Sequence, residues 1–132
     1  MSSGNGVAPA ELDQQLRRSA RTAAGDRLRS LTYFTDDDHE QVYLRSDLDA
    51  DADLSAFVAR ARDGFDAADA YKGTELGDYR YTIRRFEHGS VVRVTAEESG
   101  AIATAEGLTV ERCEEIASAL HSVLASEAPL EA

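Results

Sequence analysis

Residues 79–96 read YRYTIRRFEHGSVVRVTA, and this stretch decides the fold class of the chain. Aromatic and aliphatic residues alternate with arginine and threonine over 79–84, which is the period of two of a half-buried β-strand. Turn residues follow at 87–90, and the alternation resumes over 92–96. The stretch therefore predicts a β-hairpin within an antiparallel sheet.

The neighbouring segments extend this sheet in both directions. A second turn at 97–100 leads into a short strand at 101–106, which completes a three-stranded meander. Upstream, residues 28–35 are rich in aromatic and β-branched residues, and a returning strand at 40–45 follows a polar turn. The chain is therefore predicted to contain five strands.

Three segments carry apolar residues at the spacing of an amphipathic helix. The first follows Pro9 and ends at Gly25, the second covers 54–68, and the third begins after Thr109. Asp53 and Thr109 are residue types that cap helix N-termini. The predicted order of elements is α-β-β-α-β-β-β-α, which makes the chain an α+β protein.

Length and charge limit the classes of protein to which the chain can belong. Its 132 residues predict a single domain, which we expect at 8–126 between tails at 1–7 and 127–132. The 25 acidic residues outnumber the 14 basic ones, the net charge is -11, and Lys72 is the only lysine. This balance is typical of proteins adapted to high salt, and it argues against nucleic-acid binding because phosphate is repelled.

Other absences in the sequence narrow the function. No run of about 18 apolar residues occurs, so no membrane span is predicted. Cys113 is the only cysteine, which excludes an internal disulfide and suits a reducing cytoplasm. His121 lies about 12 Å from Cys113 along the last predicted helix, too far for a nucleophile–base pair. No catalytic triad, phosphate loop or zinc spacing is present, so we predict neither an enzyme nor a cofactor.

Two acidic segments are candidates for a cation site. Residues 36–40 read DDDHE, which is also the composition of a solvated turn. Aspartates at 47, 49, 51 and 53 imitate the start of a calcium loop, which needs glycine at its sixth position and glutamate at its twelfth. Counting from Asp47, those places hold Ala52 and Val58. We therefore predict no specific metal site.

In this acidic chain, a cluster of positive charge is formed by four arginines, namely Arg80, Arg84, Arg85 and Arg93. They fall on the third and fourth predicted strands, and guanidinium groups recognise carboxylates and phosphates. One interpretation is a binding site for an anionic ligand or partner. The other is internal pairing with the chain's own carboxylates, for example those of the middle helix.

The order of elements resembles the roadblock/LC7 group of profilin-like domains over about residues 9–126. The resemblance implies a five-stranded antiparallel sheet of strand order 2-1-5-4-3, with the first and last helices on one face and the middle helix on the other. It also implies regulation of a small GTPase or a related switch ATPase. GAF, PAS and longin domains contain related sheets, so element order supports the superfold rather than a function.

The roadblock resemblance further implies a homodimer interface made by the middle helix and the third strand. Aromatic residues that can anchor such an interface are Phe57, Phe65, Tyr79 and Tyr81. The alternative is that all four pack inside one protomer.

Two stretches are similar to a family of small haloarchaeal proteins of unknown function. They read LRSLTYFTDDDHEQVYLRSDL at 28–48 and GDYRYTIRRFEHGSVVRV at 77–94. This similarity implies no activity, but it agrees with the halophilic charge balance.

Two functions of different classes follow from these observations. The first is a non-enzymatic, homodimeric protein-interaction module in a halophilic cytoplasm, which binds another protein but no nucleic acid or membrane. The alternative is a sensor similar to GAF and PAS domains, which binds a small anionic ligand at a sheet face lined by Arg80, Arg84 or Arg93. Such a sensor needs an enclosed cavity of a few hundred Å³.

Overall fold

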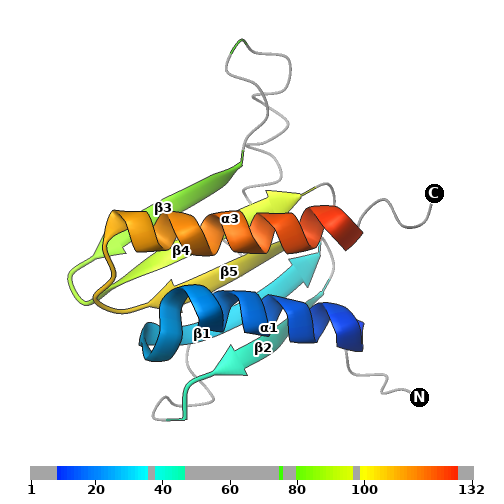
Figure 1. The fold of residues 1–132 in the computed structure, drawn as a ribbon, viewed down its shortest axis with the longest axis horizontal. Coiled ribbons are helices and arrows are strands. Elements are labelled where there is room, and N and C mark those ends of the chain that lie inside the picture. Colours follow the sequence, from blue (N-terminus) through cyan, green and yellow to red (C-terminus); the bar gives the residue numbers. More distant parts are fainter. Residues whose placement is uncertain (1–8, 36–37, 47–74, 76–79, 97–98, 128–132) are drawn as a thin grey trace.

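The computed structural model of the chain describes residues 9–35, 38–46, 75, 80–96 and 99–127. These residues form a five-stranded antiparallel sheet with two helices on one of its faces (Figure 1). The described elements, in chain order, are α1 (Ala10–Ala24), a short 3-10 helix η1 (Gly25–Arg27), β1 (Leu28–Thr35), β2 (His39–Leu44), β3 (Tyr81–Phe86), β4 (Gly89–Ala96), β5 (Ser99–Ala105) and α3 (Val110–Glu127).

The order of strands in the sheet is β2-β1-β5-β4-β3, which confirms the predicted topology. β5 lies between the two hairpins and pairs with β1 on one side and β4 on the other. β2 and β3 are therefore the two edge strands. The predicted middle helix at 54–68 and the predicted tail at 1–7 lie outside the described residues, as do residues 128–132 of the tail predicted at 127–132. Glu127, the first residue of that predicted tail, is the last residue of α3.

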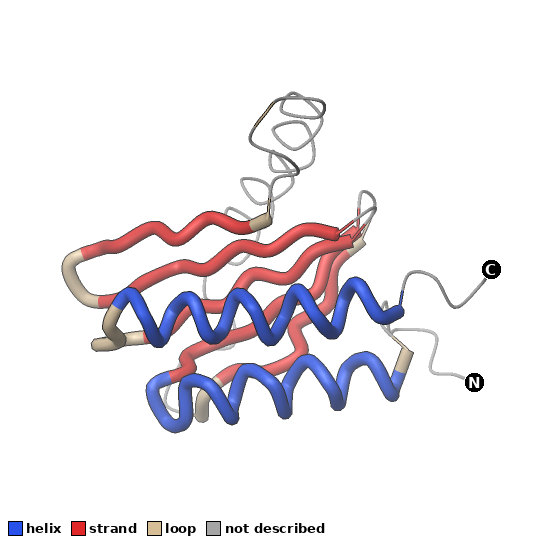
Figure 2. Tube along the Cα trace, turned by 45° about the horizontal axis from the view of Figure 1, so that its top comes forward, coloured by secondary structure: helices blue, strands red, loops and turns tan. Residues whose placement is uncertain are grey.

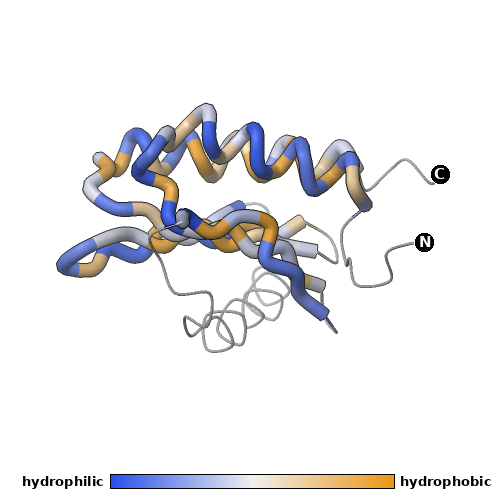
Figure 3. Tube along the Cα trace, turned by 90° about the horizontal axis from the view of Figure 1, so that it is seen from below, coloured by the Kyte–Doolittle hydropathy of each residue, from blue (hydrophilic) through white to orange (hydrophobic). Residues whose placement is uncertain are grey.

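The two helices run antiparallel to each other on the same side of the sheet, as Figures 2 and 3 show. Leu12, Leu16, Ala20 and Ala24 recur every fourth residue on α1, and all four are buried. α1 ends where the Gly25 backbone takes a φ of 63°, and the Gly25 N–H bonds to the carbonyl of Arg21. α3 buries its own stripe against the same core, made of Cys113, Ile116, Ala117, Leu120 and Leu124.

The other face of the sheet carries a smaller buried cluster of Phe34, Val91 and Ile102. These residues come from β1, β4 and β5, and the ladder places them side by side because cross-strand partners share a face. The main core between sheet and helices and this second cluster together bury the sheet on both faces.

The structure corrects the predicted turn of one hairpin and reveals a bulge in the other. β3 continues to Phe86 and β4 begins at Gly89, so the hairpin is joined by two residues rather than by the four predicted at 87–90. In β2, the register shifts between Leu31 and Thr32 of the partner strand. Because of this bulge, Val42 and Tyr43 both contact the main core, although a regular strand would direct them to opposite faces.

Candidate interaction site at the β3 edge

β3 is an edge strand whose outer side pairs with none of the described strands. Its first half is partly buried, and its second half, from Arg84 to Phe86, is exposed. Phe86 is 59% exposed, and Val110 is the other large apolar residue that is exposed among the described residues. An edge of this kind presents a row of backbone N–H and C=O groups to which another strand can bind.

The pairing with β4 shows which backbone groups of β3 face outward. Phe86 and Gly89 flank a two-residue connection, so they form a hydrogen-bonded pair, and such pairs then alternate along the ladder. Arg84 and Thr82 therefore bond to β4. The backbone groups of Tyr81, Ile83 and Arg85 point away from the sheet.

Side chains of β3 alternate between the two faces. Tyr81 and Ile83 pack against the main core beneath the helices. Arg84 is the register partner of Val91, which belongs to the cluster on the opposite face. The edge therefore presents Tyr81, Ile83 and Arg85 on the helix side, and Thr82, Arg84 and Phe86 on the other side.

The alternation separates the four arginines that the sequence singles out. Arg84 and Arg93 lie on the same face, and Arg93 Nη2 donates a hydrogen bond to Thr82 Oγ1 at 3.1 Å. Arg85 lies on the helix face, where its Nη1 donates to the Leu108 carbonyl at 2.6 Å and ties the end of β3 to the loop before α3. Arg80 precedes β3 and is exposed.

Of the four aromatic residues assigned to a dimer interface, the structure describes one. Tyr81 is half-buried at the first position of β3. Phe57, Phe65 and Tyr79 lie outside the described residues.

Two arginines that were not identified from the sequence join neighbouring segments at the end of the sheet where β1 begins. Arg45 donates to the Asp26 carbonyl at 3.0 Å and pairs with Glu106 at 2.5 Å. Arg112 of α3 donates to the Ala23 carbonyl through Nε at 3.1 Å and Nη2 at 2.8 Å. The Arg112 guanidinium thereby satisfies a carbonyl at the C-terminus of α1.

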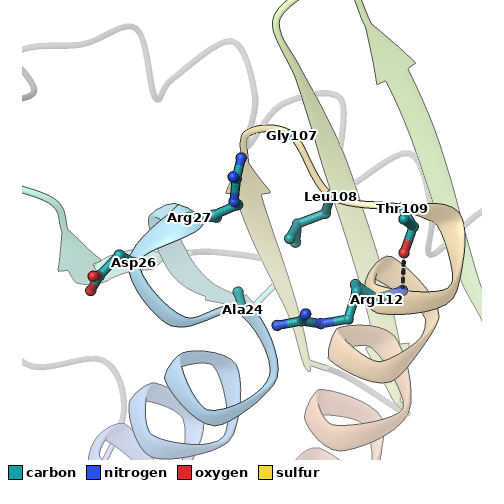
Figure 4. Close-up of a pocket in the computed structure, with 7 residues that line it drawn as sticks. All are labelled: Ala24, Asp26, Arg27, Gly107, Leu108, Thr109 and Arg112. Carbon is teal, nitrogen blue, oxygen red and sulfur yellow. Dashed lines mark hydrogen bonds between the residues drawn. The ribbon is translucent and has the colours of Figure 1, made fainter.

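A hollow of about 360 Å³ opens at the same end (Figure 4). Its lining comes from the end of α1, from η1 and from the loop that leads into α3, and comprises Ala24, Asp26, Arg27, Gly107, Leu108, Thr109 and Arg112. Thr109 Oγ1 accepts a hydrogen bond from the Arg112 N–H at 3.1 Å, so Thr109 caps α3 as predicted. These contacts hold the end of α1, η1 and the loop before α3 together, and we assign them a structural role.

Neither the acidic turn nor the single cysteine forms a metal-binding site among the described residues. Asp38 and Thr35 close the β1–β2 turn through two hydrogen bonds, of 2.9 Å and 3.2 Å. Asp36, Asp37 and the aspartates at 47–53 lie outside the described residues. Within the described part of the chain, no three His, Cys, Asp or Glu residues are grouped closely enough to hold a metal ion. Cys113 is fully buried.

One carboxyl group has an altered acidity. Asp13 of α1 is partly buried, and this burial raises its pKa above the ordinary value. Arg17, one turn further along α1 with Nη2 at 3.2 Å from Asp13 Oδ1, opposes that rise in pKa. Glu40 of β2 adds to it through its charge and a hydrogen bond.

The family described as "Domain of unknown function (DUF7522)" matches residues 14–125, from the first turns of α1 almost to the end of α3. This chain belongs to the DUF7522 family. No curated protein matches the DUF7522 chain in sequence.

Eleven solved protein chains match it in structure. One is the gliding protein MglB from Thermus thermophilus, with a TM-score of 0.55 and 14% sequence identity over 93% of this chain and 95% of that chain. At this identity the likeness concerns the fold of the DUF7522 domain alone. No described helix of the domain is long and apolar enough to cross a bilayer.

Proposed function

We propose that this DUF7522 domain is a non-enzymatic protein-interaction module that acts as a homodimer and regulates a GTPase or a related switch ATPase. The observation that carries the proposal is the outer edge of β3, which pairs with no strand in the described part of the chain. It combines three outward-facing backbone positions with an exposed phenylalanine and exposed arginines on a roadblock-like sheet. Edge strands of this length invite pairing unless they are covered.

The homodimer is supported by the position of the edge and by the residues assigned to it. Tyr81 lies at the first position of β3, next to the exposed Arg80. Phe57, Phe65 and Tyr79 complete the proposed interface. We further propose that Arg80, Arg84, Arg85 and Arg93 contribute to partner binding, with Arg84 and Arg93 on one face of the sheet and Arg85 on the other.

The partner and the cellular setting in this proposal are supported by the fold and by the composition of the chain. The nucleotide-hydrolysing partner rests on the resemblance of fold to roadblock domains, since function is not determined by fold. The halophilic, cytoplasmic setting rests on the net charge of -11 and on the single cysteine of the chain. We propose that residues 8–126 fold as one domain in that setting.

Beside the arginines of β3, the described part of the chain contains no cavity large enough for the alternative sensor function. The hollow beside Arg80, Tyr81 and His121 measures only about 90 Å³. The larger hollow lies at the other end of the sheet, next to Arg27 and Arg112. Small-molecule sites measure roughly 300–1,000 Å³, so the hollow beside Arg80 is too small for a ligand. The larger hollow is lined by none of the arginines assigned to the ligand. The interaction module is therefore the better supported function.

Light scattering in molar KCl tests the homodimer directly. We expect a particle of twice the chain mass of 14.3 kDa at micromolar concentration. A strict monomer at every accessible concentration contradicts the proposal. The regulatory role is tested by affinity capture from a native-salt lysate followed by an assay of the captured NTPase. We expect its hydrolysis or nucleotide-exchange rate to change when the pure domain is added, and an unchanged rate contradicts regulation.

A further inference from the structure

The backbone groups and side chains of β3 restrict the ways in which two copies of this strand can pair. Two copies related by a twofold axis perpendicular to the sheet pair antiparallel, with the same residues contributed by both. Partner residues must also share a face, so the axis passes through a residue and not between two. Within β3, the axis positions that keep most of the strand paired are Thr82, Ile83 and Arg84.

We propose that two copies of this chain pair through β3 with the twofold axis at Ile83, an inference that rests on the proposed homodimer. Backbone hydrogen bonding gives the first reason. With the axis at Ile83, all three outward-facing residues of each strand form hydrogen-bonded pairs. Ile83 pairs with the partner's Ile83, Tyr81 pairs with the partner's Arg85, and Arg85 pairs with the partner's Tyr81. An axis at Thr82 or Arg84 leaves only two such pairs within β3.

The charges of the strand give an independent reason. An axis at Thr82 places Arg80 opposite the partner's Arg84, and an axis at Arg84 places that arginine opposite its own copy. Like charges directly opposite each other destabilise a sheet. The axis at Ile83 avoids both, because Arg84 then faces the partner's Thr82.

The same register places an arginine opposite each aromatic residue of the strand. Tyr81 faces the partner's Arg85 on the helix side, and Phe86 faces the partner's Arg80 on the other side. Cations over aromatic rings contribute about 0.5–1 kcal/mol at exposed sites. The protomer already contains such a pair, since Arg21 lies 5.2 Å from the centre of the Tyr43 ring. The register thus provides a partner for the exposed Phe86 ring, and Figure 1 shows that its strand lies at the edge of the sheet.

Cysteine cross-linking identifies the axis. Ile83→Cys, Thr82→Cys and Arg84→Cys are made separately in a Cys113→Ala background, and disulfide formation is followed in molar KCl. Directly opposite β-carbons are about 4.5–5.5 Å apart, whereas diagonal ones are about 7–8 Å apart. We expect Ile83→Cys to form the covalent dimer at least about tenfold faster than the other two, because only position 83 then lies directly opposite its own copy, and a disulfide forms less readily as the β-carbons move apart.

A mixed experiment protects the test against a variant that folds poorly. Tyr81→Cys and Arg85→Cys each cross-link slowly alone and rapidly when mixed if the axis is at Ile83. Faster cross-linking of Thr82→Cys or Arg84→Cys overturns the register but leaves the homodimer standing. Absence of cross-linking at every position in a protein that scatters light as a dimer overturns pairing through β3. A monomer by light scattering overturns the proposed homodimer itself.

Discussion

The side chain of Phe34 lies against Gly100, its register partner on the neighbouring strand β5. A β-carbon at position 100 would overlap the Phe34 ring and would lie 2.8 Å from the Val94 carbonyl oxygen. Glycine is therefore required here by the close approach of a ring and a neighbouring strand. The fully buried Phe34 in turn anchors the cluster on the face of the sheet opposite the helices.

Gly100→Ala is expected to destabilise the domain by about 1–3 kcal/mol, the usual cost of overpacking a core. Denaturant unfolding in molar KCl measures this change in the free energy of unfolding. Phe34→Leu serves as the companion variant, because it removes the ring that the new methyl group strikes. We expect the double variant to lose less than the sum of the two single losses. An unchanged stability of Gly100→Ala contradicts the close approach.

Arg112→Gln is expected to lower the free energy of unfolding by about 1–2 kcal/mol, because the carbonyl of Ala23 loses a charged donor. Arg18→Gln is the matched control, since Arg18 is an exposed arginine on α1. Thermal unfolding of both variants makes the comparison. Equal effects of the two substitutions would show that Arg112 does not clamp α1.

Asp13→Asn is expected to stabilise the domain at neutral pH. Because burial raises the pKa of Asp13 in the folded state, the folded protein binds that proton more tightly than the unfolded chain. The contribution of Asp13 to the free energy of unfolding is therefore largest below the ordinary carboxyl pKa. It is lost as the pH rises through the pKa of Asp13 in the folded state. The advantage of the neutral asparagine should therefore shrink as the pH is lowered.

Asp26→Asn is the control for this pH series, since the Asp26 side chain is fully exposed and its carboxylate makes a long ion pair of 3.7 Å with Arg21. Denaturation curves of both variants between pH 4 and pH 8 (about the carboxyl titration range and above) give the comparison. A lower stability of Asp13→Asn at pH 7 (roughly neutral) would show that the ion pair with Arg17 outweighs burial.

Phe86→Ala is expected to weaken the homodimer by about 5–30-fold, since the twofold axis removes two cation–aromatic pairs at about 0.5–1 kcal/mol each. Folding should change little because Phe86 is 59% exposed. Dissociation constants from sedimentation in molar KCl measure the effect. Val110→Ala removes the other exposed apolar side chain, which lies on α3, and should leave the constant unchanged. Equal weakening by both variants would argue against the β3 interface.

The melting temperature is expected to rise as KCl is increased. A net charge of -11 repels itself, and the Debye length falls from about 10 Å at 0.1 M salt to about 3 Å at 1 M. Melting curves at fixed pH across this range check the expectation. Sucrose, an uncharged solute, separates screening from general exclusion effects. A melting temperature that is flat or falling with KCl contradicts adaptation to salt.

Most of the fold was predictable because its signals are local. The period of two in β3 and the spacing of Leu12 and Leu16 in α1 are set by neighbours within a few residues. The features that were not predicted have equally specific causes. The two-residue hairpin and the bulge at Val42 depend on pairing between strands, which a single strand's composition does not contain.

The candidate site was predictable in its location but not in its arrangement. The arginine-rich strand was identified from composition, yet pairing with β4 separates Arg84 from Arg85 and joins Arg85 to Leu108. The arginine clamps were not foreseen. Arg45 and Glu106 are 61 positions apart in the chain, and Arg112 and Ala23 are 89 positions apart.

By itself, the sequence determined the helices and strands, their order, and a charge balance suited to high salt, because periodicity and composition act over short distances or over the whole chain. Only the tertiary structure decided which backbone groups of β3 face outward, which arginines join the end of α1 to the rest of the domain, and why position 100 must be glycine. Each of these depends on residues that are distant in the chain and meet only when the sheet closes, with β5 inserted between β1 and β4.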